Sequence, residues 1–183
     1  EAGCAFILPD RSRIKLIIAG EQVAEYRRGR WSHTNLASLK QALVRLAADS
    51  TIDVDLLSDV TRKAIVSSDI GKGRIFVIQQ KDGKAPNLQP GYKDISAAHG
   101  ASELSTKKIT ELAPMEYLTL IEGDGATILS HEGQTLAVNA KLAPAPDTQV
   151  SEIVSAGTRH LSAQKITKES DTIAIVVSDD GPI

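Results

Sequence analysis

The stretch GDGATILSHEGQTLAVNA, residues 123–140, predicts how the middle of the chain folds. Two runs rich in aliphatic residues, 125–130 and 134–140, flank the turn residues His131-Glu132-Gly133, and this pattern is typical of a β-hairpin. Gly123-Asp124-Gly125 stands before the first run, and Asp-Gly is a common turn pair. The stretch therefore predicts a helix that ends at Gly123, a tight turn, and two paired strands.

Helical and strand patterns alternate on both sides of this hairpin. Upstream, we expect helices at about 54–68, 105–113 and 115–123, with Pro114 opening the last of them, and a strand at 73–80. Downstream, a proline-containing connection at 141–156 leads to a helix that begins near residue 157 or 158 and to a strand at 171–178. The alternation predicts an α/β fold with a mixed central β-sheet flanked by helices.

The N-terminal part predicts a separate, smaller module. Residues 4–8, 13–19 and 22–31 have strand patterns separated by turn residues, and four leucines between 36 and 46 have helical spacing. We expect a β meander plus helix in residues 1–50, regulatory in role, and the main domain in residues 51–183. The sequence YRRGRW, 26–31, mixes aromatic residues with arginines and could contact nucleic acid, although its central glycine favours a solvated hairpin tip.

Composition excludes several classes of protein. The 183 residues are 42% hydrophobic and 24% charged, as in a globular domain, and the 3% of aromatic residues predicts an aliphatic core. A net charge of −2 creates no global field for a polyanion, so we expect no nucleic-acid partner and a local site for any phosphate. Cys4 is the only cysteine, which excludes an internal disulfide. With no membrane segment and no signal peptide visible, we expect a cytoplasmic protein.

Asp124 is the first candidate for a functional side chain. Its neighbours Gly123, Gly125 and Ala126 are small, so a ligand can approach the backbone closely. An aspartate in such a place could hold a divalent metal ion or accept a proton from a hydroxyl nucleophile, and the alternative is an ordinary turn. Asp180, after the last strand, would add a second carboxylate if the fold brings it beside Asp124.

The stretch GTRHLSAQ, residues 157–164, is the second candidate. It places Arg159 and His160 at a helix start, where the dipole is positive and added positive charge is unfavourable, so we expect an anion there. Gly157 would allow close approach, the Thr158 hydroxyl would donate a hydrogen bond, and Arg159 would bind phosphate oxygens as a planar fork. His160 could donate to phosphate or lie near a metal ion. The alternative is an N-capping Thr158 followed by two solvated side chains.

Taken in order, these features resemble the diadenylate cyclase domain, which joins two ATP molecules into cyclic di-AMP. The resemblance covers about residues 54–183 and rests on Asp124-Gly125-Ala126, the intervening pattern and Gly157-Thr158-Arg159-His160. It implies dependence on Mg²⁺ or Mn²⁺, ATP as the substrate, and a second protomer facing the first across a two-fold axis. A chain with one copy of each motif holds one ATP, so the other must come from a partner.

The resemblance also implies a role for each matching residue. Asp124 would be the catalytic carboxylate, with Arg159 and His160 as further catalytic residues, and Asp124 and Asp180 would hold the metal ion. Thr158, Arg159 and His160 would bind the triphosphate, and Leu142 and Ser178 would line the adenine site. The remaining nucleotide contacts would come from Gly123, Gly125, Ala126 and Gly157.

Two positions depart from the family pattern. Leu161 stands where the second motif usually continues with arginine, and Gly123 stands where relatives often have a metal-binding histidine. A lost charge-assisted contact costs about 1.5–3 kcal/mol, or roughly ten- to a hundredfold in binding or rate. The departures leave open a slower enzyme, a compensating cation such as Lys165, or a catalytically silent nucleotide-binding sensor. An interaction module that works through its N-terminal part is a further alternative.

Overall fold

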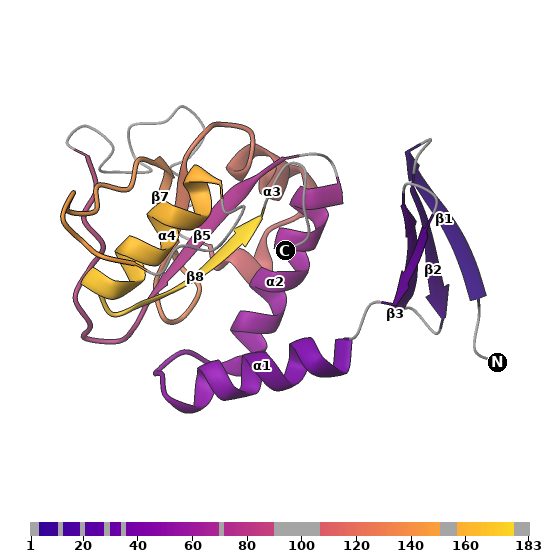
Figure 1. The fold of residues 1–183 in the computed structure, drawn as a ribbon, viewed down its shortest axis with the longest axis horizontal. Helices are drawn as coiled ribbons and strands as arrows, with labels where there is room; N and C mark the ends of the chain where they lie inside the picture. Colours follow the sequence, from indigo (N-terminus) through magenta and orange to yellow (C-terminus); the bar gives the residue numbers. More distant parts are fainter. Residues whose placement is uncertain are drawn as a thin grey trace. The chain divides into compact units, whose positions relative to one another are not determined.

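The computed structural model describes residues 4–10, 13–18, 21–27, 30–33, 36–69, 72–89, 107–150 and 157–177 (Figure 1). The chain divides into two compact units, Glu1–Leu46 and Ala47–Ile183. None of the helices in the described ranges is long and apolar enough to cross a membrane.

The first unit is built on an antiparallel meander. Its strands are β1 (Cys4–Asp10), β2 (Arg13–Ile18), β3 (Glu21–Arg27) and β4 (Arg30–His33), and they pair in that order. The strand pattern predicted at 22–31 contains two strands, β3 and β4, and their pairing of Arg27 with Arg30 agrees with the hairpin that the central glycine favoured. The two residues between them lie outside the described ranges. Helix α1 (Leu36–Ala48) follows, and the division between the units falls within it.

The second unit has a four-stranded mixed sheet in the order β7-β6-β5-β8. Strands β5 and β6 are parallel, whereas β7 and β8 are antiparallel to their neighbours. The predicted α/β fold is thereby confirmed. Its elements are α2 (Val54–Asp69), β5 (Arg74–Gln79), the 3₁₀ turn η3 (Ile109–Glu111), α3 (Pro114–Leu120), β6 (Ala126–Leu129), β7 (Thr135–Ala140), α4 (Thr158–Glu169) and β8 (Thr172–Val177).

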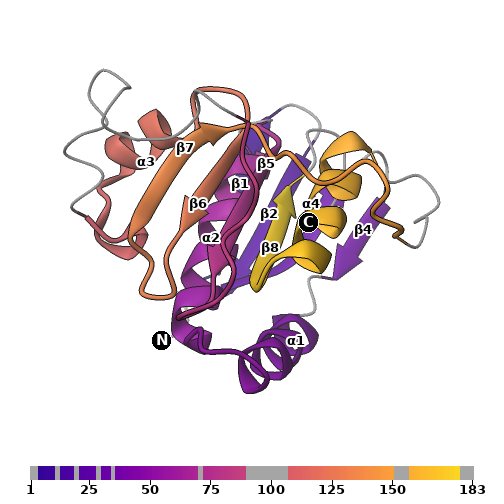
Figure 2. The ribbon, with the colours of Figure 1, turned by 90° about the vertical axis from the view of Figure 1, so that its left-hand side faces the viewer.

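Helices α2 and α4 cover opposite faces of this sheet (Figure 2). On the α4 side, Ile75 and Val77 of β5 join one buried cluster with Ala163 and Ile166. Side chains alternate along a strand, so Phe76 and Ile78, both fully buried, point to the α2 side. The run RIFVIQ is apolar at nearly every position because both faces of β5 are covered.

The helix predicted at 105–113 is wrong in its described part. Lys108 instead forms an isolated antiparallel bridge with Gln134, beyond which only the 3₁₀ turn η3 follows. Leu112 and Ala113 are extended, as expected before Pro114, which opens α3 at its first turn. The Glu116 carboxylate accepts the Ala113 backbone N–H at 2.8 Å and thereby closes the start of α3. The segment therefore carries the chain from the sheet edge into α3.

One end of the sheet brings together the ends of three strands. Ile75 near the start of β5 pairs with Ala126 at the start of β6, and Ala126 pairs with Ala140 at the end of β7. All three side chains are buried. The turn with Asp124 precedes Ala126, and the segment with Leu142 follows Ala140. Two predicted site segments therefore meet at this end of the sheet.

Candidate active site

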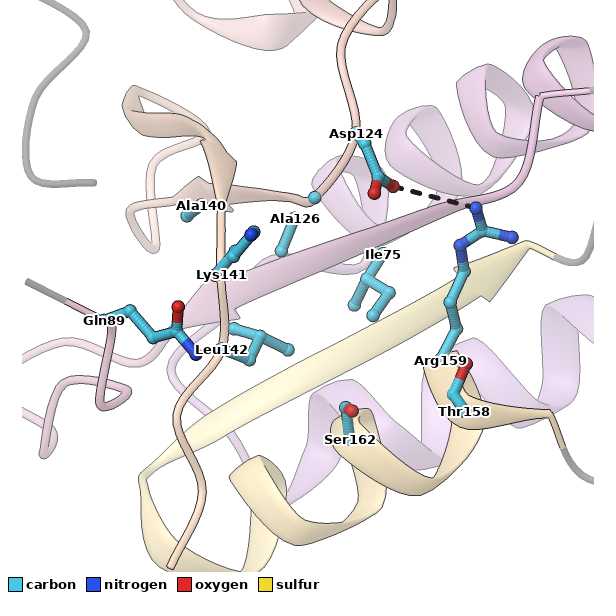
Figure 3. A pocket seen from close by; sticks show the side chains of 11 residues that line it. Ile75, Gln89, Asp124, Ala126, Ala140, Lys141, Leu142, Thr158, Arg159 and Ser162 are labelled. Atoms are coloured by element: carbon cyan, nitrogen blue, oxygen red, sulfur yellow. Dashed lines mark ion pairs between the residues drawn. The ribbon is translucent and has the colours of Figure 1, made fainter. Parts of the chain in front are cut away.

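A cleft of about 210 Å³ lies at this end of the sheet, between the strands and the start of α4 (Figure 3). Ile75, Ala126, Ala140 and Leu142 form its apolar surface. Its described lining residues are Ile75, Gln89, Asp124, Gly125, Ala126, Ala140, Lys141, Leu142, Thr158, Arg159 and Ser162. Small-molecule pockets usually enclose roughly 300–1,000 Å³, so the described residues form a small and incomplete enclosure.

The turn between α3 and β6 presents Asp124 to this cleft. Gly125 has φ of 124°, a conformation that L side chains rarely adopt, so a glycine is required at this position. Asp124 itself is 89% exposed at its side chain and extends over the cleft (Figure 3). The carboxylate is therefore free to meet a ligand from solvent.

The other polar side of the cleft is the first turn of α4. Gly157 is the N-cap, without a side-chain hydrogen bond, and the first turn has no acidic residue. The alternative in which Thr158 caps the helix is wrong, because Thr158 is already its first residue. A Cβ atom at Gly157 would meet nothing within 4 Å, so packing within the described residues does not require this glycine. The backbone amides at this end suit an anion.

Arg159 reaches from α4 toward Asp124. Its Nη2 lies 3.8 Å from Asp124 Oδ1, and the Arg159 side chain is 37% exposed (Figure 3). Ion pairs at the protein surface contribute about 0–1 kcal/mol, so this pair is a weak one. A phosphate group can therefore compete with the Asp124 carboxylate for the guanidinium.

Two chain segments form the wall opposite α4. The Gln89 backbone N–H donates to the Lys141 carbonyl at 3.0 Å, and the Ala143 N–H donates to the Asn87 carbonyl at 2.9 Å. Leu88 and Leu142 form an isolated antiparallel bridge between these bonds. The wall therefore holds Leu142 beside the small side chains of the sheet edge, where a flat apolar group can pack.

The cleft brings together six of the residues predicted for the site. Asp124, Gly125, Ala126, Leu142, Thr158 and Arg159 all line it. Gly123, Gly157 and His160 are described but do not line it, and Ser178 and Asp180 lie outside the described ranges.

Sequence reasoning missed Gln89, Lys141 and Ser162. Ser162 lies three residues after Arg159 and four after Thr158, so the helical period could have placed it on the same face. Gln89 had no local signal, because a long-range bridge brings its segment to the site.

The resemblance implies a divalent metal ion, and the described lining of the cleft offers one carboxylate for it. Asp124 is the one carboxylate among the described lining residues, and no group of three or more His, Cys, Asp or Glu residues that could hold a metal occurs in the described ranges. Mg²⁺ commonly keeps several waters and is held by one or two carboxylates together with substrate phosphates. The residues present therefore fit a metal ion that arrives with a nucleotide.

Position 161 and the suggested compensating cation lie away from the cleft lining. Leu161 is 42% exposed on α4, and Lys165 donates from Nζ to the Pro146 carbonyl at 3.1 Å. The structure therefore gives no support to Lys165 as a replacement for the missing arginine, because its ammonium group is bound to the connection before α4.

Residues 64–183 match the family model described as DisA bacterial checkpoint controller nucleotide-binding, abbreviated DAC. The matched range includes the sheet, the Asp124 turn and α4. The comparison with curated proteins gave no match.

Proposed function

The chain belongs to the DAC family of DisA nucleotide-binding domains, and on this premise we propose that it is a diadenylate cyclase that condenses two ATP molecules into cyclic di-AMP. The observation that carries the proposal is the placement of Asp124 and Arg159 on opposite sides of one open cleft, 3.8 Å apart. One side chain can take a proton and the other can bind phosphate, and these are the two tasks that nucleotidyl transfer needs.

ATP would occupy the cleft with its two ends on different surfaces. The adenine ring would pack on the apolar surface made by Ala126, Ala140 and Leu142, of which the two alanines are buried. The triphosphate would lie at the start of α4, where Arg159, the Thr158 hydroxyl and the helix amides can bind its oxygens. This orientation leaves the ribose near Asp124.

In the reaction, the 3′-hydroxyl oxygen of one ATP attacks the α-phosphorus of the other. A phosphodiester bond forms, the bond to the β-phosphate oxygen breaks, and pyrophosphate leaves. Asp124 would accept the hydroxyl proton, and Arg159 would stabilise the negative charge on the phosphate oxygens. In a second step, the 3′-hydroxyl of the other nucleotide attacks the α-phosphorus of the first, which closes the ring and releases a second pyrophosphate. Most of the acceleration would come from positioning and charge neutralisation.

When bound, Mg²⁺ or Mn²⁺ would neutralise phosphate charge and polarise the phosphoryl oxygens. Of the described residues, Asp124 would hold it, and we propose that Asp180 adds a second carboxylate.

The second ATP would come from another copy of the chain. The matched range contains one copy of each motif, and the cleft is small and open to solvent beside Asp124. We propose that two protomers face each other across a two-fold axis, so that each cleft supplies one nucleotide to the shared reaction. We also propose that residues 51–183 are the catalytic domain and that residues 1–50 are a regulatory module.

A direct assay tests this function. Purified protein with ATP and Mn²⁺ should release cyclic di-AMP, detected by mass spectrometry, and Asp124→Asn should not. Glu122→Gln is the matched control, because Glu122 is an exposed carboxylate beside the same turn that does not line the cleft. No product from the wild-type protein at any protein concentration would contradict the proposal.

Leu161 favours a second candidate function, that of an adenine-nucleotide sensor without turnover. The family usually has a cation at this position, whereas the chain has an exposed aliphatic side chain. Equilibrium binding of ATP, measured by calorimetry beside the product assay, separates the two functions. Binding without product supports the sensor, and binding with product supports the cyclase.

A further inference from the structure

Asn139, near the end of β7, lies directly against the turn that carries Asp124. A Cβ atom built on Gly123 would lie 2.2 Å from Asn139 Nδ2, and one on Gly125 would lie 2.6 Å from the Asn139 carbonyl carbon. Both separations are far shorter than van der Waals contact. The two glycines that flank Asp124 therefore rest on Asn139, one on its side chain and the other on its backbone.

The backbone at Asn139 is unusual in a way that serves this contact. Its φ is 52°, in the left-handed region, which asparagine tolerates better than most non-glycine residues. The pairing of β6 with β7 is also irregular here, because Ala126 lies opposite Ala140 while Ile128 lies opposite Ala137. Two steps along β6 thus match three along β7, which is a β-bulge. Such bulges are frequent beside active sites, where they redirect a side chain.

The side chain of Asn139 also has an unmet requirement. Its Oδ1 atom is buried and has no hydrogen-bond partner among the described residues. Burying an unsatisfied polar atom costs free energy, and so does a left-handed backbone at a residue other than glycine. An apolar side chain would avoid the cost of the unsatisfied polar atom, and a glycine would avoid the cost of the left-handed backbone. Their combination at one residue, beneath the candidate catalytic turn, is the kind of strain found at functional sites.

We propose that Asn139 is a positioning residue that holds the Asp124 carboxylate over the cleft through the contact between its carboxamide and Gly123. Asn139 does not line the cleft, so it acts through the turn and not on the substrate. The effect of Asn139 on the rate of the reaction rests on the proposed cyclase function, whereas its effect on the placement of the turn does not.

Two substitutions separate positioning from folding. Asn139→Gly accepts the left-handed backbone and removes the whole side chain, the carboxamide included, and Asn139→Asp keeps the shape of the side chain. We expect Asn139→Gly to lower kcat by about ten- to a hundredfold with the KM for ATP nearly unchanged, because a small displacement of a reacting group has effects of this size. Asn139→Asp should keep most of the wild-type kcat.

The matched control is Asp82→Gly. Asp82 is the other described non-glycine residue with positive φ, at 55°, and it lies in the turn after β5, at the opposite end of that strand from Ile75. This variant should leave kcat and KM unchanged. If Asn139→Gly does not fold, Asn139→Ser takes its place with the same expectation.

A second readout does not depend on activity. Backbone amide resonances of Gly123, Asp124 and Gly125, and their hydrogen-exchange rates, should change in Asn139→Gly but not in Asp82→Gly. Unchanged amides together with unchanged kcat would overturn the proposal. If the wild-type protein makes no cyclic di-AMP, the proposed function fails, and the amide comparison still decides whether Asn139 positions the turn.

Discussion

The guanidinium of Arg159 lies 3.8 Å from the carboxylate of Asp124, although one residue opens α4 and the other precedes β6. Both side chains extend from backbone that is held elsewhere, by the cap of α4 and by the contacts of the glycine turn. Because Asp124 is exposed and Arg159 is partly exposed, this ion pair contributes little to the free energy of unfolding. Substitutions of either residue should therefore report on ligand binding and turnover, and not on folding.

Asp124→Asn should abolish turnover while ATP affinity stays within about an order of magnitude of wild type, because the amide keeps the shape of the side chain and loses its ability to accept a proton. The measurements are initial rates of cyclic di-AMP formation and the Kd for ATP. Glu122→Gln should behave as wild type in both. Full activity of Asp124→Asn would remove this carboxylate from the reaction.

Arg159→Ala should weaken ATP binding by about ten- to a hundredfold, which corresponds to the loss of a charge-assisted contact worth about 1.5–3 kcal/mol. Titration calorimetry with ATP measures the effect. Arg62→Ala is the matched control, since Arg62 is 77% exposed at its side chain and pairs with Asp59 on α2 at 3.2 Å. Equal affinities for the wild type and Arg159→Ala would show that Arg159 is solvated and not a phosphate ligand.

Mixing wild-type protomers with Asp124→Asn protomers should suppress the cyclic product and release a linear intermediate, because a mixed pair can form only one of the two phosphodiester links. Activity per protomer should also rise with protein concentration wherever the dimer is weak. Mass spectrometry of products across a dilution series, with sedimentation at the same concentrations, checks both effects. Constant activity per protomer where only monomer sediments would refute the paired mechanism.

Tyr117→Phe should destabilise the protein by about 1–3 kcal/mol without changing ATP affinity, because it removes the two hydrogen bonds of a buried hydroxyl, each worth about 0.5–1.5 kcal/mol. Tyr117 is 4% exposed, its hydroxyl lies 2.6 Å from Ser67 Oγ, and it donates to the Lys63 carbonyl. Urea unfolding measures the difference. Thr119→Ala is the control, because the exposed Thr119 hydroxyl donates to the Met115 carbonyl within α3.

Stability should fall as the pH rises from about 10 toward about 12, and less steeply in Tyr117→Phe. Burial raises the pKa of Tyr117 to about 12, whereas a tyrosine in the unfolded chain ionises near its ordinary value of 10.0. The unfolded state therefore loses its proton first and is favoured as the pH rises. Unfolding curves of both proteins at several alkaline pH values measure this, and parallel pH dependence would contradict it.

Much of the fold was predictable because apolar residues recur in its elements at the spacing of a helix or of a strand. The strand predicted at 125–130 corresponds to β6 (Ala126–Leu129), and the helix predicted from residue 157 or 158 corresponds to α4 (Thr158–Glu169). The prediction at 105–113 was wrong because the pairing of Lys108 with Gln134, which is distant in sequence, overrode the local pattern.

The site was predictable in its chemistry but not in its assembly. Asp124 and Arg159 were recognisable as a carboxylate between glycines and a cation at a helix start, yet their separation depends on the strand order, which no local pattern encodes. Gln89 and Asn139 were not recognisable. Gln89 owes its place to pairing with the Lys141 carbonyl, which is distant in sequence, whereas Asn139 owes its place to the irregular register of β7 against β6.

The pairing of β8 with β5 has a consequence for synthesis on the ribosome. Ile75, in the apolar surface of the cleft, pairs with Val176, which is translated long after it. A nascent chain therefore emerges with one edge of β5 unsatisfied, and such an edge invites chaperones or a strand from another molecule. The sheet beneath the cleft is completed only when β8 leaves the exit tunnel, so a ribosome that stalls before that point displays an unfinished sheet.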